Sequence, residues 1–247
     1  MPVSITKMVL KRVGRLLRSA IKEGDDRPYQ TYLYRDTYIE GHIDTVQLFY
    51  SLGISNELNG ASWLDLGCNG GSTCILAASN GAAPVTGVDF NESALALARQ
   101  HIAAADVSVS LVKGNIIEFV ETDDQYDFVS MFALFRHVHG ALLAANGITV
   151  PKSPLPYLVN SSFETLILGK NSPVDAEFRE FLKKCLNLSR RYFFCSINDR
   201  AGLIVRRKEE VEAFFWRLSE RIEEIEIYQM PSPNQDYTVA SIRMSSS

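Results

Sequence analysis

Hydrophobic residues between positions 63 and 132 fall into four short apolar runs, separated by stretches with helical periodicity. Runs of this length are typical of strands buried in a sheet, and the intervening stretches are typical of helices. We expect strands at 63–66, 84–90, 107–111 and 126–132, with helices at 72–78 and 94–103. Strands that alternate with helices predict an α/β fold built on a mostly parallel sheet.

The pattern continues on both sides of this region. Toward the C-terminus we expect helices at 178–188 and 208–218, and strands at 191–197, 222–228 and 237–244. Toward the N-terminus we expect a helix at 41–50, preceded by a segment with four tyrosines, 29–38. Such a segment suits a lid or a pocket wall, and equally an ordinary packing seam between a helix and the domain. We divide the chain into an N-terminal helical cap or lid, residues 1–60, and a single globular unit, residues 61–244.

Residues 4–22 predict a basic amphipathic helix. Such a helix can lie on an anionic membrane surface or contact RNA phosphates. It can equally pack its apolar side on the domain and leave its charges in water, which is the commoner arrangement.

Composition limits the class of protein. With 247 residues, 46% of them hydrophobic, the chain is long enough for one large domain with a proper core. A formal net charge of -4 gives no overall attraction to nucleic acid, although nucleic acid is retained as a less favoured partner. The four cysteines form no C-x-x-C pair, and no apolar run approaches the ~18 residues that span a bilayer. These features, with no secretory leader, predict a soluble cytoplasmic protein with reduced thiols; oligomeric state is left open.

A glycine-rich turn follows the first strand and its acid, Asp65. Gly67, Gly70 and Gly71 allow a tight turn in which a ligand can approach the backbone, and Ser72 or Thr73 is expected to cap the helix that follows. A dinucleotide fingerprint would require glycine at 69 and 72, where this chain has asparagine and serine. Asn69 tolerates a left-handed backbone better than most residues, so the turn can still form.

A second acid, Asp89, ends the next strand and precedes Phe90. A carboxylate at this place can accept hydrogen bonds from both hydroxyls of a ribose, and the phenyl ring can stack on an adenine. After the third strand, Asn115 offers a carbonyl that can accept from an adenine amino group.

These motifs, in this order, resemble those of the class I S-adenosylmethionine-dependent methyltransferases. The resemblance rests on Asp65, Gly67, Gly71 and Asp89; Asn69 and Asn115 stand where the family usually has glycine and aspartate. It implies a Rossmann-like sheet of seven mostly parallel strands with an antiparallel last strand, helices on both faces, and S-adenosylmethionine as cofactor. It implies cofactor contacts at Asp65, Gly67, Cys68, Asn69, Gly71, Asp89, Phe90, Asn115, Ile116 and Phe132.

The segment after the fourth strand is where this fold directs residues at the transferred methyl group. His137 and His139 are therefore candidate general bases, because histidine titrates near neutral pH. Neither has Cys, Asp or Glu at ligand spacing, so no metal site is expected. The G-x-x-D-T sequence at 41–45 resembles small-molecule and tRNA wobble-uridine methyltransferases, which implies that Tyr34, Arg35 and His42 lie near the cofactor carboxylate or the substrate.

The sequence thus favours methyl transfer to an oxygen or nitrogen atom of a small-molecule or sugar-like acceptor. The absence of a recognisable nucleophile and base set agrees with this, because a sulfonium methyl group needs no covalent intermediate. A tRNA-modifying enzyme and a non-catalytic cofactor-binding partner subunit are the alternatives.

Overall fold

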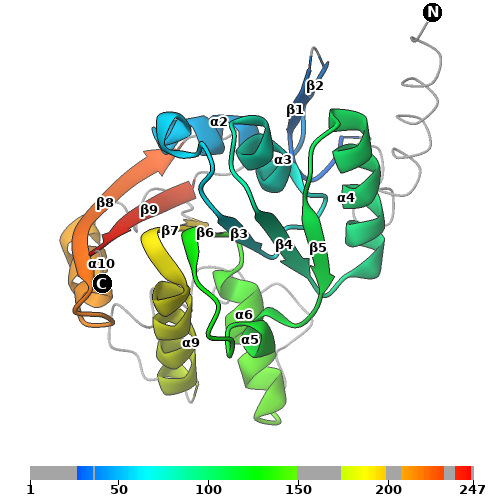
Figure 1. Ribbon diagram of the computed structural model, residues 1–247. Coiled ribbons are helices and arrows are strands. Elements are labelled where there is room, and N and C mark those ends of the chain that lie inside the picture. Colours follow the sequence, from blue (N-terminus) through cyan, green and yellow to red (C-terminus); the bar gives the residue numbers. More distant parts are fainter. Residues whose placement is uncertain (1–26, 36, 149–173, 199–206, 231–236, 246–247) are drawn as a thin grey trace, which may run out of the picture. The chain divides into compact units, whose positions relative to one another are not determined.

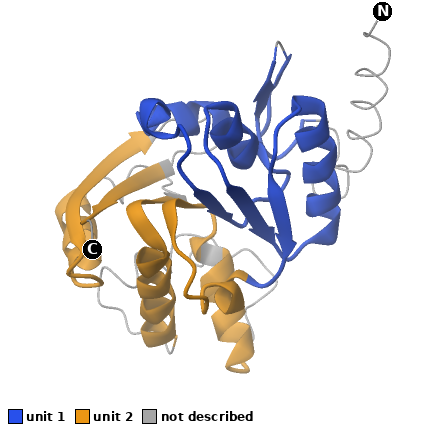
Figure 2. Ribbon diagram, in the orientation of Figure 1, with its two compact units in different colours: residues 1–115 blue, residues 116–247 orange. Residues whose placement is uncertain are grey.

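The computed structural model describes residues 27–35, 37–148, 174–198, 207–230 and 237–245. The basic amphipathic helix predicted at 4–22 lies outside the described residues. The chain divides into two compact units, residues 1–115 and 116–247 (Figure 2).

Unit 1 is built on three parallel strands, β3 (Trp63–Leu66), β4 (Val85–Asp89) and β5 (Ser110–Lys113) (Figure 1). β4 pairs with β3 on one side and with β5 on the other. Every residue of β3 is buried, which explains its uninterrupted apolar sequence. α3 (Ser72–Ser79) packs on β3 and β4, and α4 (Glu92–Ala105) packs on β4, β5 and α3.

A hairpin precedes this sheet, within the tyrosine-rich segment 29–38 and the residue that follows it. β1 (Tyr32–Tyr34) and β2 (Thr37–Ile39) pair antiparallel, and β1 contacts α3. Only α2 (Thr45–Ser51) and the short 3₁₀ helix η2 (Ser55–Glu57) are helical among residues 27–60 as described. The described part of the predicted N-terminal cap or lid, residues 27–60, thus consists of a hairpin followed by these helices; the division of the chain at residue 60 stays a prediction.

The G-x-x-D-T sequence has a structural role in this segment. A Cβ on Gly41 would lie 2.3 Å from the carbonyl carbon of Gln30, so only glycine permits the close approach of these two backbones. Asp44 is the N-cap of α2, and its carboxylate accepts the amide of Gln47 at 2.9 Å. The motif thus fixes the entry of the chain into α2.

Unit 2 continues the order of strands and helices. Its elements are α5 (Ile116–Phe119), β6 (Tyr126–Phe132), α6 (Phe135–Ala145), α9 (Asp175–Leu188), β7 (Ser189–Asn198), α10 (Lys208–Trp216), β8 (Ile222–Met230) and β9 (Tyr237–Met244). β7 pairs parallel with β6 and antiparallel with β9, and β8 pairs antiparallel with β9. α9 packs on β6, β7 and α6, and α10 packs on β8.

The seven strands follow the order β5-β4-β3-β6-β7-β9-β8. β9, the last described strand of the chain, is antiparallel to both of its neighbours, while β3 pairs parallel with β4, β4 with β5, and β6 with β7. The predicted Rossmann-like α/β fold with an antiparallel last strand is confirmed. All four cysteines are buried and free. Within the described residues, no helix combines the length and the apolar character required to cross a bilayer.

Candidate functional site

The glycine turn between β3 and α3 has the left-handed backbone that its sequence predicted. Gly67, Asn69 and Gly71 have φ values of 74°, 49° and 80°. Asparagine is among the few non-glycine residues that adopt this region readily, so Asn69 replaces the usual glycine without disrupting the turn.

Backbone hydrogen bonds attach the turn to β4. The amides of Gly67 and Cys68 both donate to the carbonyl of Val88, at 2.8 and 3.0 Å. Within the turn, the amide of Gly71 donates to the carbonyl of Cys68 at 2.9 Å, and the amide of Gly70 donates to the side-chain oxygen of Asn69 at 2.7 Å. The turn is therefore a closed structure whose backbone is held at several points.

Asp89 joins the end of β4 to this turn. Its side chain is only 7% exposed. Oδ2 accepts the Asn69 amide at 2.9 Å, and Oδ1 accepts the Asn91 amide at 2.8 Å. Because a carboxylate oxygen can accept two hydrogen bonds, each oxygen retains capacity for a ligand hydroxyl.

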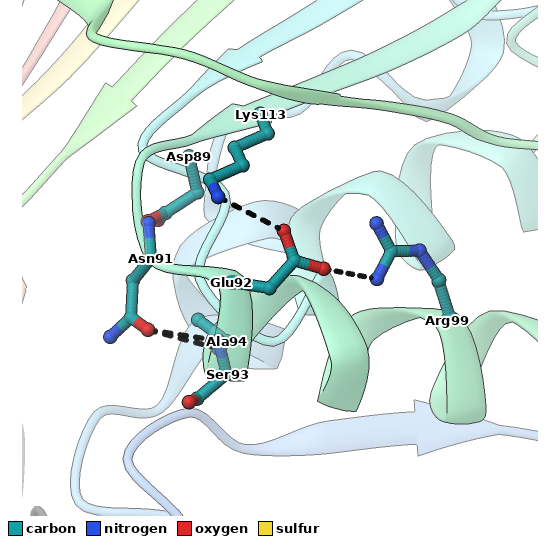
Figure 3. Close-up of polar contacts among 7 residues, drawn as sticks. All are labelled: Asp89, Asn91, Glu92, Ser93, Ala94, Arg99 and Lys113. Carbon is teal, nitrogen blue, oxygen red and sulfur yellow. Dashed lines mark hydrogen bonds and ion pairs between the residues drawn. The ribbon is translucent and has the colours of Figure 1, made fainter.

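The residues after Asp89 open α4 (Figure 3). Asn91 is the N-cap, and its side-chain oxygen accepts the amides of Ser93 at 3.0 Å and Ala94 at 3.4 Å. Glu92, the first residue of α4, accepts a hydrogen bond from Arg99 (Nη1–Oε1 2.9 Å). Its other carboxylate oxygen, Oε2, lies 3.7 Å from the ammonium nitrogen of Lys113. The hydrogen bond from Arg99 is the main reason why the pKa of Glu92 is lowered. Phe90 is 76% exposed, which leaves its ring free to stack on a planar ligand.

Asp65, in β3, and Cys68, in the turn, are both buried. Asp65 is 3% exposed, and Cys74 on α3 donates its thiol to Oδ2 of Asp65 at 3.8 Å. The hydrogen bond with Cys68, burial and the nearby Asp65 all raise the pKa of the Cys74 thiol. The Cys68 side chain is completely buried, so any ligand contact of this residue is expected through its backbone.

The predicted cap of α3 is wrong in detail. The N-cap is Gly71, which makes no side-chain capping bond. Ser72, expected to be a cap, instead donates its hydroxyl to the carbonyl of Thr31 at 2.6 Å. The serine thus attaches the β1 segment to the beginning of α3.

Three of the predicted cofactor contacts lie at the end of a strand or just after it. Asn115 is exposed and closes unit 1; Ile116 begins α5 and is half-buried; Phe132 ends β6 and is half-buried. Directly after Phe132, Ala133 has φ 57°, and its amide donates to the hydroxyl of the buried Ser196 at 2.9 Å. Alanine is unfavourable in this region, so the end of β6 carries a strained turn that β7 stabilises.

The two candidate histidines have different surroundings on α6. His137 is exposed near the N-terminus of the helix. His139 is 8% exposed, and its ring meets Phe178 of α9 edge-on at 6.0 Å. Burial lowers the pKa of His139, and the nearby Asp175 partly offsets this.

The predicted substrate residues are spread over the hairpin and the segment after it. Tyr34 is 6% exposed and belongs to the core of unit 1. Arg35 pairs with Asp106 (Nη2–Oδ2 3.0 Å), which is the C-cap of α4. Since α4 has 14 residues and rises about 1.5 Å per residue, this pair lies roughly 20 Å from the Asn91 end of the helix. The backbone of His42 donates to Pro28, and its side chain is half-buried.

The structure therefore brings together Gly67, Asn69, Gly71, Asp89 and Phe90, and it places Arg35 at the far end of α4 from them. Sequence reasoning gave no role to Tyr32, which packs against the turn, or to Ser196, which holds Ala133. Tyr32 lies in the tyrosine-rich segment 29–38, but Gly70, the turn residue that its hydroxyl contacts, is distant in sequence. Ser196 carries no sequence signal at all.

The glycine turn after β3 and the buried acid at the end of β4 form a corner at the carboxyl ends of two parallel strands, where open α/β sheets bind their ligands. Residues 64–146 match a known family, described as "Methyltransferase domain". This segment covers β3 to α6, including the turn and Asp89. The predicted resemblance to class I S-adenosylmethionine-dependent methyltransferases is confirmed.

Known proteins of this kind resemble the chain over different lengths. A ubiquinone biosynthesis O-methyltransferase from Sodalis glossinidius is 35% identical over 98 residues, covering 39% of each chain. A protein of the same description from Aeromonas salmonicida is 27% identical over 183 residues, covering 66% of this chain and 71% of that protein. The first curated relatives are thus matched over about two fifths of their length or less.

Solved structures show the same fold at low sequence identity. Magnesium protoporphyrin IX methyltransferase from Synechocystis PCC 6803, with bound SAM, superposes with a TM-score of 0.54 at 14% identity, covering 81% of this chain and 77% of that chain.

Proposed function

We propose that this protein transfers a methyl group from S-adenosylmethionine to an oxygen or nitrogen nucleophile of a small-molecule or sugar-like acceptor. The observation that carries the proposal is the pair of hydrogen bonds that the Asp89 carboxylate accepts from the backbone amides of Asn69 and Asn91. They join the glycine turn and the strand-end acid into one ligand corner. The match to methyltransferase relatives, including ubiquinone biosynthesis O-methyltransferases, supports the same function.

The residues of this corner fit the nucleoside part of the cofactor. In the proposal, Asp89 accepts the two ribose hydroxyls and Phe90 stacks on the adenine, while Asn115 and Ile116 complete the adenine contacts. The left-handed turn at Gly67, Cys68, Asn69 and Gly71 leaves room for the methionine part to approach the backbone. When bound, the cofactor supplies a methyl group already activated by its sulfonium, so the protein has to position the acceptor and exclude water.

The simplest test is calorimetric titration of the full chain with S-adenosylmethionine and S-adenosylhomocysteine, with NAD as a control. We expect micromolar binding of the first two compounds and none of NAD.

Asp89→Asn keeps the shape of the side chain but removes the charge that strengthens its hydrogen bonds, and should weaken binding by about 1.5 to 3 kcal/mol. Asp123→Asn, at an exposed position, serves as the matched control and should bind like the wild type. Equal affinity in the Asp89 and Asp123 variants would remove the ribose assignment.

For the transfer step, we propose His137 as the base and His139 as the alternative. Exposure of His137 at the start of α6 supports the first choice, and the lowered pKa of His139 means that it is neutral near pH 7, as a base must be. His137→Ala is expected to lose at least about 100-fold in turnover, the usual contribution of a general base, while its affinity for the cofactor stays unchanged. A variant with full turnover excludes this residue, and the same assay of His139→Ala then decides the alternative.

The acceptor class can be decided in the same preparation. Turnover with hydroxyl or amine compounds supports the small-molecule proposal. Salt-dependent retention of tRNA would favour a tRNA-modifying enzyme, and tight cofactor binding without turnover, together with a stable partner, would favour a non-catalytic subunit. We further propose a cytoplasmic location, which four buried free cysteines support.

A further inference from the structure

Gly70, the second of the three glycines in the turn, has to be glycine for a different reason from Gly67 and Gly71. Gly67 and Gly71 have positive φ angles, whereas Gly70 is outside the left-handed region. A Cβ on Gly70 would lie 1.9 Å from the hydroxyl oxygen of Tyr32 and 3.3 Å from a methyl carbon of Leu97. The Tyr32 hydroxyl therefore occupies the space that a side chain at position 70 would need.

Other parts of unit 1 fix Tyr32 in this position. Its side chain is 1% exposed, and its ring stacks on His101 of α4, with a centroid distance of 4.0 Å and an interplanar angle of 8°. The preceding residue, Thr31, accepts the Ser72 hydroxyl through its carbonyl and the Gly41 amide through its own hydroxyl. The location of the Tyr32 hydroxyl is thus set by its stacking on α4 and by the bonds that Thr31 makes with Ser72 and Gly41.

We propose that Tyr32 is a positioning residue for the cofactor turn, which it holds through contact of its hydroxyl with Gly70. The contact extends to the ligand corner, because Gly70 donates to the Asn69 side chain and Asn69 donates to Asp89. Tyr32 acts on the ligand through these residues and not by touching it. The inference rests on the proposed function, since it assigns to Tyr32 the support of the same site.

The first test removes only the hydroxyl. Tyr32→Phe keeps the ring, its stacking on His101 and its burial, and it frees the space beside Gly70. We expect the Kd for S-adenosylhomocysteine to rise about 3- to 10-fold, because a binding turn that is less well supported must be ordered by the ligand. Tyr50→Phe, which removes a phenolic hydroxyl from a residue 45% exposed on α2, is the control and should keep the wild-type Kd. A Tyr32→Phe protein that binds like the control contradicts the proposal.

A double-mutant cycle gives a sharper test. Gly70→Ala puts a Cβ into the position of the hydroxyl and should raise the Kd about tenfold or more. In the double variant Tyr32→Phe, Gly70→Ala the oxygen is absent, and the nearest ring atom is 3.2 Å from the new Cβ. We therefore expect the double variant to bind more tightly than Gly70→Ala alone, a non-additive result that identifies direct contact. Additive effects would overturn the assignment.

Amide hydrogen exchange separates this inference from the proposed function. In Tyr32→Phe the amides of Asn69 and Gly70 should exchange faster while the free energy of unfolding, measured with urea, changes little. This readout needs no cofactor. If the wild type bound neither S-adenosylmethionine nor S-adenosylhomocysteine, the proposed function would fail. Unchanged amide exchange in the turn of Tyr32→Phe would contradict only the role of Tyr32.

Discussion

At the scale of single residues, His101 shows how strongly a buried position can alter a side chain. It is 3% exposed, and its Nε2 atom has no hydrogen-bond partner among the described residues. Burial disfavours the charged imidazolium and lowers the pKa of His101 to about 4. The histidine is therefore neutral in the folded protein over a pH range in which it is protonated in the unfolded chain.

This difference predicts acid-dependent stability. The stability that the protein has with a neutral His101 is fully present above the unfolded pKa of this residue, about 6.5. It is lost as the pH falls through the folded pKa, because the unfolded chain then binds a proton that the folded protein does not. Between about pH 7 and about pH 4.5, the wild type should lose roughly 2 to 3 kcal/mol more unfolding free energy than His101→Phe. Phenylalanine keeps an aromatic ring against Tyr32 but does not titrate. Urea denaturation at a series of pH values measures both proteins, and parallel curves would contradict the prediction.

Two other residues show what a single position can and cannot reveal in sequence. The left-handed conformation of Asn69 was predictable because asparagine is one of few side chains suited to it. Ala133 adopts the same region although alanine has no preference for it. Its conformation depends on Ser196, which lies on another strand, so no local sequence rule could have found it.

At the scale of elements, the beginning of α4 connects the candidate site to helix stability. Asn91 places its backbone amide on Asp89 and its side-chain oxygen on the amides of Ser93 and Ala94. One residue thus ends the ligand corner and caps the helix that supports it. The cap was predictable, because Asn-Glu-Ser before an alanine-rich helix is a typical N-terminal sequence.

Removing this cap should affect stability more than ligand binding. Asn91→Ala loses the side-chain capping bonds and is expected to lower the unfolding free energy by about 1 kcal/mol. The backbone bond to Asp89 does not require the side chain, so the affinity for S-adenosylhomocysteine should change by less than about threefold. Asn91→Asp, which also caps helices, is the matched control. Urea denaturation and calorimetry of the three proteins measure the two effects separately; a large loss of affinity in the alanine variant with unchanged stability would contradict the assignment.

The β1–β2 hairpin is one of the elements that the sequence did not reveal. Its strands have three residues each, too few for a clear alternating pattern. Its position depends on contacts with α3 and α4, such as the ring stack of Tyr32 on His101, which are separated widely along the chain. Tyrosine, threonine and isoleucine favour strands, but segments of three residues are too short for this preference to identify a hairpin.

At the scale of the whole molecule, the order of elements was more predictable than the details of the site. Short apolar runs with intervening helices identified all seven strands of the sheet, because strands in a buried sheet have a distinctive composition. The roles of His137, His139, Tyr34, Arg35 and His42 remain predictions. They depend on the acceptor, and acceptor-binding segments differ among proteins that share a fold.

The hydrogen bonds of Asp89 have a consequence for the entropy of binding. They are already formed without a ligand, so the conformations of Asn69 and Asn91 are restricted when the protein folds and not when the nucleoside arrives. A preorganised corner of this kind lets the contacts made by the ligand contribute to affinity with little loss to backbone ordering.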